Sequence, residues 1–351
     1  MKRVLIGVMG AAGLVSSAMA QSTVTVYGLI DLGPTYFKGG PGQKLKRLDS
    51  GISFGSRLGF RGSEDLGDGL SAIFNLEMPI RADTGDVPAP LFGREAWLGL
   101  RNSSWGTLTL GRQTDYMVDF GIWYSGGMLS EGAYGFHPGD YDRVAGQRYD
   151  NSIKFTSNKL GPVRVGALVA AGEGVAGRSQ SAGVMYDEGP VKASLMYTSI
   201  DKLVIDPRNQ IGINSLNGVG LTGPVTTERV DIMGAGAGYR GDKFAVAALY
   251  TRVNLRMPLG SQTLATTEIN GKYQVTPLSF IAASAAHSGL ENNVWNKYYL
   301  TYDYLLSKRT DIYVSYTHLK VSDGNRAVLI ALPASTGPSA SALRVGMLHR
   351  F

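Results

Sequence analysis

Apolar and polar residues alternate with a period of two in many segments of this chain. In residues 297–304, Tyr298, Leu300 and Tyr302 occupy every second position, and polar side chains lie between them. Residues 71–78, 268–275 and 311–318 repeat the pattern. Successive side chains of a β-strand point to opposite faces. The alternation therefore predicts strands with one apolar face and one polar face.

The lengths of the connections distinguish between the two folds that fit such strands, a soluble sandwich and a membrane barrel. Seven short turns are predicted, at 63–69, 102–106, 157–162, 187–190, 240–243, 276–277 and 307–310. They alternate with eight longer loops, near 38–51, 81–91, 113–147, 171–179, 200–228, 254–264, 287–296 and 321–340. Short turns at one end and long loops at the other are typical of outer-membrane barrels.

We therefore predict an all-β protein, a 16-stranded antiparallel transmembrane β-barrel whose first and last strands meet at the short-turn end. Closure of the sheet removes the exposed edges through which strands aggregate. The last segment, 341–351, alternates in the same way and ends on Phe351, which is expected in an aromatic girdle at the membrane interface.

Residues 1–20 have the features of a secretory signal peptide. Lys2 and Arg3 precede an apolar run at 4–15, and Ala18-Met19-Ala20 is a small-residue cleavage site. The apolar run is shorter than the roughly 20 residues that a membrane helix requires. We expect cleavage after Ala20 and a single barrel domain over residues 21–351.

Charge and composition exclude several classes of function. Removing Lys2 and Arg3 lowers the net charge from +6 to +4, which is too small and dispersed for nucleic-acid binding. The chain has no cysteine, and its four histidines lack metal-ligand spacing, so we expect no metal and no cofactor. No helical pattern follows the glycine-rich segment 234–238, so it is interpreted as a close-packed strand at a subunit interface and not as a phosphate loop.

The longest connection, 113–147, has the features of a functional loop. Loops of this length are rare in compact domains unless they are functional or disordered. Its aromatic residues favour an ordered loop, and it is acidic, with Asp115, Asp119, Glu131, Asp140 and Asp142. Arginines lie in or beside neighbouring strands, at positions 57, 94, 143 and 148. An acidic loop facing arginines indicates a constriction in a tube, although arginine is also common as an ordinary solvated residue of a barrel lumen.

Several short motifs resemble those of the Gram-negative general porins, above all the 16-stranded porins of beta-proteobacteria. They are Val24-Thr25-Val26-Tyr27-Gly28, Ser56-Arg57-Leu58-Gly59-Phe60-Arg61-Gly62, Leu108-Thr109-Leu110-Gly111-Arg112-Gln113 and the terminal Arg350-Phe351. The resemblance implies a homotrimer in the outer membrane, with the third loop folded into each barrel as an eyelet. It also implies that Phe351 serves as an assembly signal for the barrel-insertion machinery.

The resemblance implies site residues as well. Arg57, Arg94 and Arg148 match the family's basic wall, Glu77 matches an acidic position near it, and Glu131 matches the acidic loop tip. The tip motif departs from the family at Ser130, where a proline is usual, and at Gly132, where a phenylalanine is usual. Strand alternation places Arg57 and Leu58 on opposite faces of their strand, as a lumen position requires. It places Arg94 on the same face as the apolar Leu98, and a β-bulge between them could reconcile this with a lumen position for Arg94. Asp115 and Asp119 complete the predicted constriction, and Arg61 and Arg143 are secondary candidates.

The sequence thus predicts a passive diffusion channel for ions and small hydrophilic solutes, with a modest preference for anions. Its expected partners are two further copies of the chain, outer-membrane lipids, the assembly machinery and the permeating solutes. One alternative is a channel adapted to organic anions. Another, from a different class, is an outer-membrane barrel enzyme or adhesin, although no hydrolytic constellation stands out in the sequence.

Overall fold

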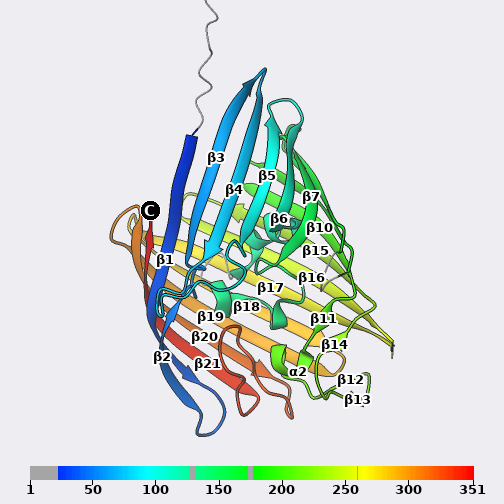
Figure 1. Cartoon of the computed structure of the whole chain (residues 1–351). Helices are drawn as coiled ribbons and strands as arrows, with labels where there is room; N and C mark the ends of the chain where they lie inside the picture. Colours follow the sequence, from blue (N-terminus) through cyan, green and yellow to red (C-terminus); the bar gives the residue numbers. More distant parts are fainter. Residues whose placement is uncertain (1–22, 127–131, 173–176, 259) are drawn as a thin grey trace, which may run out of the picture.

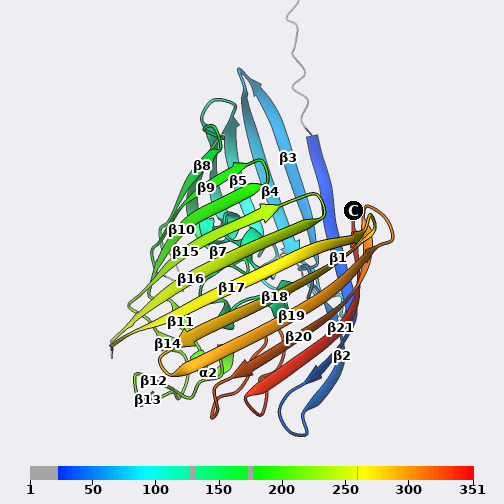
Figure 2. The same cartoon turned by 180° about the vertical axis from the view of Figure 1, so that it is seen from behind.

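The computed structural model describes residues 23–126, 132–172, 177–258 and 260–351. The predicted signal peptide, its cleavage site after Ala20, and Glu131 at the predicted loop tip therefore lie outside the described residues. The described part forms a tilted barrel, and the segment between β6 and β7 lies within its outline in both views (Figures 1 and 2).

Within the described ranges, seventeen strands form one closed sheet. β1 (Thr23–Lys38) pairs with β3 (Arg57–Gly67) through its first half and with β2 (Lys44–Ser50) through its second half. β2 and β3 are therefore two parts of one barrel strand, and the barrel has 16 strands. β21 (Ser339–Arg350) pairs antiparallel with β1 and closes the barrel. The predicted 16-stranded antiparallel barrel is confirmed.

The remaining strands of the barrel follow in antiparallel order. They are β4 (Leu70–Pro79), β5 (Glu95–Asn102), β6 (Gly106–Thr114), β7 (Arg148–Ser157), β8 (Val163–Ala170), β9 (Ser179–Glu188), β10 (Val191–Asp201), β15 (Arg229–Arg240), β16 (Phe244–Met257), β17 (Gly260–Thr276), β18 (Ser279–Leu290), β19 (Asn293–Leu305) and β20 (Thr310–Val321). The connection 202–228 carries α2 (Pro207–Gln210) and the short strands β11 (Val204–Ile205), β12 (Ser215–Leu216), β13 (Val219–Gly220) and β14 (Val225–Thr226).

The seven predicted short turns are confirmed, but three of the predicted long loops are wrong. Residues 38–51 include β2, and the hairpins β16–β17 and β18–β19 continue almost to their tips. Backbone pairing continues there. Beyond the apolar band both faces of a strand meet water, so the apolar–polar contrast that marks a strand in the sequence is lost.

Large apolar side chains point outward from the barrel, whereas many inward positions are polar. The exposed fractions of Leu98, Leu195 and Ile269 are 63%, 66% and 65%. On the inner face Lys154, Glu268 and Asn270 lie buried. This distribution is the reverse of that in a soluble protein and is the one that a barrel surrounded by lipid requires. Among the described residues, no helix has both the length and the apolar character to span a bilayer.

The connection between β6 and β7, here called the third loop, contains short helical segments. Its described part contains four short helical turns: α1 (Tyr116–Asp119), η1 (Ile122–Tyr124), η3 (Gly132–Gly135) and η4 (Pro138–Asp140). Tyr116, Met117 and Tyr124 are fully buried in the core cluster that the loop forms with the inner wall. The main apolar core of this protein therefore lies inside the barrel, between loop and wall.

Glycines of the inner wall provide the space for these aromatic side chains. A Cβ added to Gly236 would lie 2.2 Å from Cδ2 of Tyr124, and one added to Gly238 would lie 2.5 Å from Cζ3 of Trp123. Gly166 meets the Tyr116 ring in the same way, at 2.0 Å. In the segment 234–238 the glycines face inward, so on that face their packing partner is the third loop.

The end of the chain completes the pairing at the short-turn end. Phe351 and Gly28 exchange two backbone hydrogen bonds of 3.1 Å, and the Phe351 ring lies against Gly28. Near this seam, Arg344 is buried and donates to the hydroxyl of Tyr313 (2.7 Å) and to the carbonyl of Gly33 (2.8 Å). These contacts join the first and last strands of the barrel.

The packing of Tyr124 on Gly236 predicts opposite results for two neighbouring substitutions. Gly236→Val places a side chain where the Tyr124 ring lies, and overpacking a core typically costs about 1–3 kcal/mol. Ala237→Val places the same valine side chain on the outward face of the same strand, away from the third loop. We expect a lower thermal unfolding midpoint and faster proteolysis of the third loop only for Gly236→Val. Equal effects of the two variants would show that the loop does not depend on this packing.

Candidate functional site

A cavity of about 780 Å³ lies inside the barrel between one part of the wall and the third loop. Four arginines contribute to its lining: Arg57, Arg94, Arg112 and Arg148. The third loop contributes a mostly apolar side with Val118, Ile122, Ala133, Phe136 and Asp140. Residues 328–332 of the connection between β20 and β21 complete the enclosure. The cavity therefore has a basic side and a loop side, as the sequence predicted for a constriction.

Glu77 on β4 is the carboxylate that organises the basic side. Its Oε1 lies 2.6 Å from Nε of Arg94 and its Oε2 lies 3.7 Å from Nε of Arg57. The hydroxyl of Tyr27 donates to Oε2 at 2.9 Å. Glu77 is 7% exposed, so its charge is taken up by two arginines and a phenol. Such charge-assisted contacts fix the guanidinium planes.

Arg94 lies just before β5, which begins at Glu95. Its backbone N–H donates to the Glu77 carbonyl at 3.1 Å. The alternation of β5 therefore does not apply to Arg94, and the proposed bulge is not needed. Arg148, the first residue of β7, donates from Nε to the Arg94 carbonyl at 2.9 Å. These contacts bring the three predicted arginines to one side of the cavity.

Arg112 is a fourth lining arginine that the sequence analysis did not select. It donates to the Gly93 carbonyl (2.8 Å) and pairs with Asp150 (2.5 Å). Arg112 is two residues after Leu110, which points outward, so strict alternation would direct the Arg112 side chain outward as well. The β6–β7 pairing shifts register between Gly111 and Gln113, and a bulge of this kind breaks the alternation.

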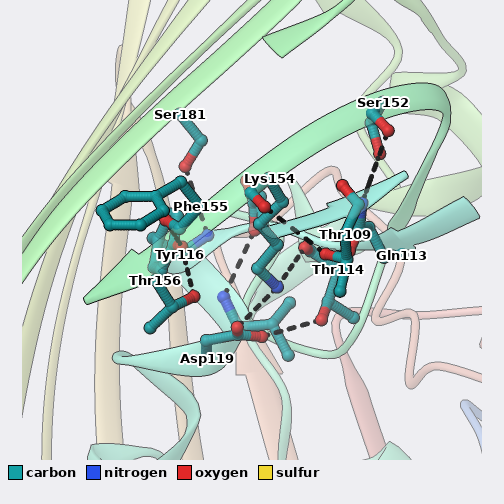
Figure 3. A network of polar contacts seen from close by, with 12 residues as sticks. Thr109, Gln113, Thr114, Tyr116, Asp119, Ser152, Lys154, Phe155, Thr156 and Ser181 are labelled. Carbon is teal, nitrogen blue, oxygen red and sulfur yellow. Dashed lines mark hydrogen bonds and ion pairs between the residues drawn. The ribbon is translucent and has the colours of Figure 1, made fainter. Parts of the chain in front are cut away.

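Two of the predicted loop acids lie against the barrel wall and not along the cavity. Asp115 is fully buried, accepts from Thr198 Oγ1 at 2.6 Å, and caps α1 through the Val118 N–H. Burial raises the pKa of Asp115, although the bond from Thr198 opposes the shift. Asp119 pairs with Lys154 at 2.5 Å and accepts from Thr114 at 2.7 Å (Figure 3). Both carboxylates hold the start of the loop.

The two secondary candidates do not line the cavity either. Arg143 is packed with its guanidinium 5.3 Å from the centre of the Tyr149 ring. Arg61 lies 5.0 Å from the centre of the Tyr27 ring, toward the short-turn end of β3. Each arginine is therefore stacked on an aromatic ring, an arrangement that guanidinium groups favour.

Among the described residues of the third loop, Asp140 is the carboxylate that lines the cavity. Its two oxygens accept from the Ala145 N–H at 2.8 Å and from Gln147 Nε2 at 2.9 Å. Burial and the charge of Asp142 raise the pKa of Asp140 to about 7. Asp140 therefore gains its proton more readily than an ordinary aspartate as the pH falls. Its presence in the loop was noted from the sequence, but nothing there marked it as the lining residue.

His137 connects the third loop to the wall through two buried carboxylates. Its Nδ1 lies 2.5 Å from Oδ2 of Asp142, and its Nε2 lies 2.9 Å from Oε2 of Glu268 on β17. Thr251 on β16 also donates to Asp142 Oδ2, at 2.8 Å. Burial alone would lower the pKa of His137, but the charge and hydrogen bonds of Asp142 and Glu268 raise it to about 10. The imidazole is therefore a cation at neutral pH, flanked by two anions.

Sequence analysis considered the histidines only as metal ligands and missed this anchor. Within the described ranges, no group of histidine, aspartate and glutamate side chains has the arrangement of a metal site. His137 and Glu268 are 131 positions apart, and only the fold brings them together.

Comparison with known proteins agrees with the fold. A family model described as Gram-negative porin matches residues 8–324. An outer membrane porin protein from Bordetella pertussis is 27% identical over the whole of both chains, and outer membrane porin protein 32 from Delftia acidovorans is 28% identical over the whole of both chains.

Solved structures show the same architecture. An anion-selective porin from Comamonas acidovorans superposes with a TM-score of 0.79 at 23% identity, covering 94% of this chain and all of the other. The trimer form of OmpT from Vibrio cholerae superposes with a TM-score of 0.69 at 14% identity, covering 94% and 99%. Because the porin model matches most of the sequence and the barrel closes with 16 strands around an inward-folded third loop, this chain belongs to the Gram-negative porin family and forms a channel in the outer membrane.

Proposed function

We propose that the arginine-lined cavity is the constriction of the channel and that it gives the channel a preference for anions. The observation that carries the proposal is the charge balance of the lining. Among the described lining residues there are four arginines and one carboxylate, Asp140. Glu77 lies behind the arginines and neutralises them only in part.

The arginines are suited to this role because their charge does not depend on pH in the physiological range. Rings of arginine or lysine are the usual means by which a pore favours anions. The opposite side of the cavity is mostly apolar, so the field across it is screened less than in bulk water. Small anions are thus attracted to the basic side while they pass.

An adapted channel for organic anions is the second candidate. Val118, Ile122 and Phe136 face the arginines across the cavity and offer apolar contact to the body of an organic anion. Block of chloride current by aromatic carboxylates, but not by acetate, would favour this candidate over a general pore.

We further propose that the chain assembles as a homotrimer and that Phe351 signals its assembly. The trimer form of OmpT, which has the same barrel, supports the first statement. Phe351 is 44% exposed at the short-turn end, where an assembly factor can reach it, which supports the second.

The first prediction concerns the arginines. Replacing Arg57 and Arg148 by Ser removes two positive charges from the cavity and should move the zero-current potential toward cation selectivity. In a tenfold KCl gradient ideal selectivity corresponds to about 59 mV, and we expect a shift of roughly 10–30 mV. The shift should decrease near 1 M salt, where the screening length is about 3 Å. Planar-bilayer recording measures both quantities.

The matched control is the double replacement of Arg101 and Arg164 by Ser. Both residues lie on barrel strands but do not line the cavity. The control removes the same charge and should leave the reversal potential nearly unchanged. Equal shifts in the two double variants would mean that total charge, and not the cavity, sets selectivity.

The second prediction concerns pH. Protonation of Asp140, whose pKa is about 7, removes a negative charge from the cavity as the pH falls. Anion preference should therefore rise between pH 8 and pH 6. Asp140→Asn should show the stronger preference at both pH values. If the anion preference of Asp140→Asn depends on pH as it does in the wild type, the titrating group is not Asp140.

The third prediction concerns the His137 anchor. His137→Gln leaves Asp142 and Glu268 buried without their cation, and breaking a buried ion pair by removing one partner typically costs about 3–5 kcal/mol. We expect a lower unfolding midpoint and more frequent closures of single channels. His287→Gln, which alters an exposed histidine, is the control.

The pH dependence of this effect follows from the raised pKa of His137. The stabilisation by its charge is complete below the unfolded value of about 6.5 and is lost as the pH rises through about 10. Wild type and His137→Gln should therefore differ most near pH 6, differ progressively less as the pH rises, and approach each other above pH 10. A constant difference up to pH 11 would contradict the charged anchor.

A further inference from the structure

The outward face of β10, β15, β16 and β17 carries arginines where a membrane barrel normally carries apolar residues. The strand register defines its rows of side chains. Met233 lies opposite Arg252, and Arg252 lies opposite Ala265. Toward the long-loop end, Asp231 lies opposite Asn254, and Arg229 lies opposite Arg256. These residues lie on the same face of the sheet as Met233 and Tyr250, which are 50% and 43% exposed on the outside of the barrel.

Among the described residues, the arginines of this face share a single carboxylate. Asp231 accepts from Nε of Arg229 at 2.9 Å and lies 2.8 Å from a terminal nitrogen of Arg256. Arg252 donates to a neutral group, the Asn254 side chain, at 3.3 Å. Asp201, at the end of β10, is paired with Arg178 at 3.8 Å. The outward cluster of Arg229, Arg252 and Arg256 with Asp231 therefore carries a net charge of +2.

The height of the cluster matches a lipid headgroup. Tyr239 and Phe244 stack at the short-turn end and belong to an aromatic girdle. Arg252 and Arg256 follow Phe244 by eight and twelve residues on β16. At about 3.3 Å per residue and a strand tilt of about 40°, the two arginines lie roughly 20 and 30 Å above the girdle. The apolar band of such barrels is about 25 Å tall, so the guanidinium groups lie at the boundary of the leaflet on the long-loop side.

Directly below the cluster, the outer wall is hollowed. A cavity of about 430 Å³ is lined by Ala193, Ala237 and Ala248 at its floor. Val184, Leu195 and Tyr250 project around it and are 46%, 66% and 43% exposed. The register places Tyr250 one row below Arg252 and Ala248 one row further. Charge and hollow are therefore continuous along one face of the sheet.

We propose that this face binds a phosphorylated lipid of the outer leaflet, with its phosphate against Arg252 and Arg256 and one acyl chain in the hollow. Guanidinium groups bind phosphate through paired, charge-assisted hydrogen bonds. In a bilayer, burial of an acyl chain gives no hydrophobic gain, so the hollow contributes by close packing. The site is external to the pore and does not depend on the selectivity proposed above.

A second barrel is a poorer occupant of the same face. Contact of this face with the same face of another copy would bring together two clusters that each carry a net charge of +2, and burial of like charges without added anions is destabilising. A lipid phosphate supplies the missing anion. Copy-to-copy contact is nevertheless distinguished by the experiment below.

The test uses the full-length protein in detergent, titrated with bis-phosphorylated lipid A, with bound lipid counted by native mass spectrometry. The double variant Arg252→Gln with Arg256→Gln should bind lipid A at least about tenfold more weakly than the wild type. Arg252→Gln alone provides a milder variant. Ala237→Leu with Ala248→Leu fills the hollow and should weaken binding severalfold while leaving both arginines in place. Lys320→Gln, which removes an outward cation at the long-loop end of β20, should bind like wild type.

Two further binding measurements identify the ligand. Inorganic phosphate in large molar excess should not displace lipid A, and a zwitterionic phospholipid should bind equally to all variants. The proposal is overturned by wild-type binding in both arginine variants. It is overturned equally if inorganic phosphate displaces lipid A while the hollow-filling variant binds normally, since the site would then be a simple anion site. Efficient crosslinking between copies through Ala237→Cys would assign the face to a second barrel. Ion selectivity, measured in parallel, should be the same in all these variants.

Discussion

The attachment of the third loop to the inner wall is the constraint on which the rest of this structure depends. A barrel of 16 strands encloses more space than its own side chains fill, so an inward-folded segment must be held by specific contacts. Here the contacts are of two kinds. Inward glycines such as Gly236 admit aromatic side chains of the loop, and His137 connects Asp142 of the loop to Glu268 of the wall. Without them the cavity would have no second side.

The anchoring contacts also determine what charge remains for the pore. Most acidic side chains of the loop that the structure describes take part in internal contacts: Asp115 with Thr198, Asp119 with Lys154, and Asp142 with His137. A buried carboxylate needs such partners, because desolvation of its charge is otherwise very costly. The described acidic side chains of the loop therefore present little negative charge to the cavity, and most of them attach the loop to the wall.

Fold and site differed in how far the sequence could predict them. The barrel was predictable because period-two alternation and the connections at the short-turn end are local signals, and each spans only a few residues. The three arginines were found through their resemblance to the family's basic wall. Arg112 was missed because strict alternation would place it on the outward face, and the register shift between Gly111 and Gln113 is not visible in the sequence. The His137 anchor was missed because its members are brought together only by barrel closure.

The same reasoning explains why loop acidity misled the assignment of constriction residues while strand arginines did not. A strand position has its side chain direction set by backbone pairing, so a residue there faces either lumen or lipid. A residue in a compact loop has no such rule, and its direction depends on which partner the packed state offers. Asp115 accepts from Thr198 at the wall, whereas Asp140 accepts from Ala145 and Gln147 of its own loop and lies beside the cavity. Three of the four arginines that line the cavity, Arg57, Arg112 and Arg148, thus lie at strand positions, whereas the direction of each described loop carboxylate depends on the partners that the packed loop offers.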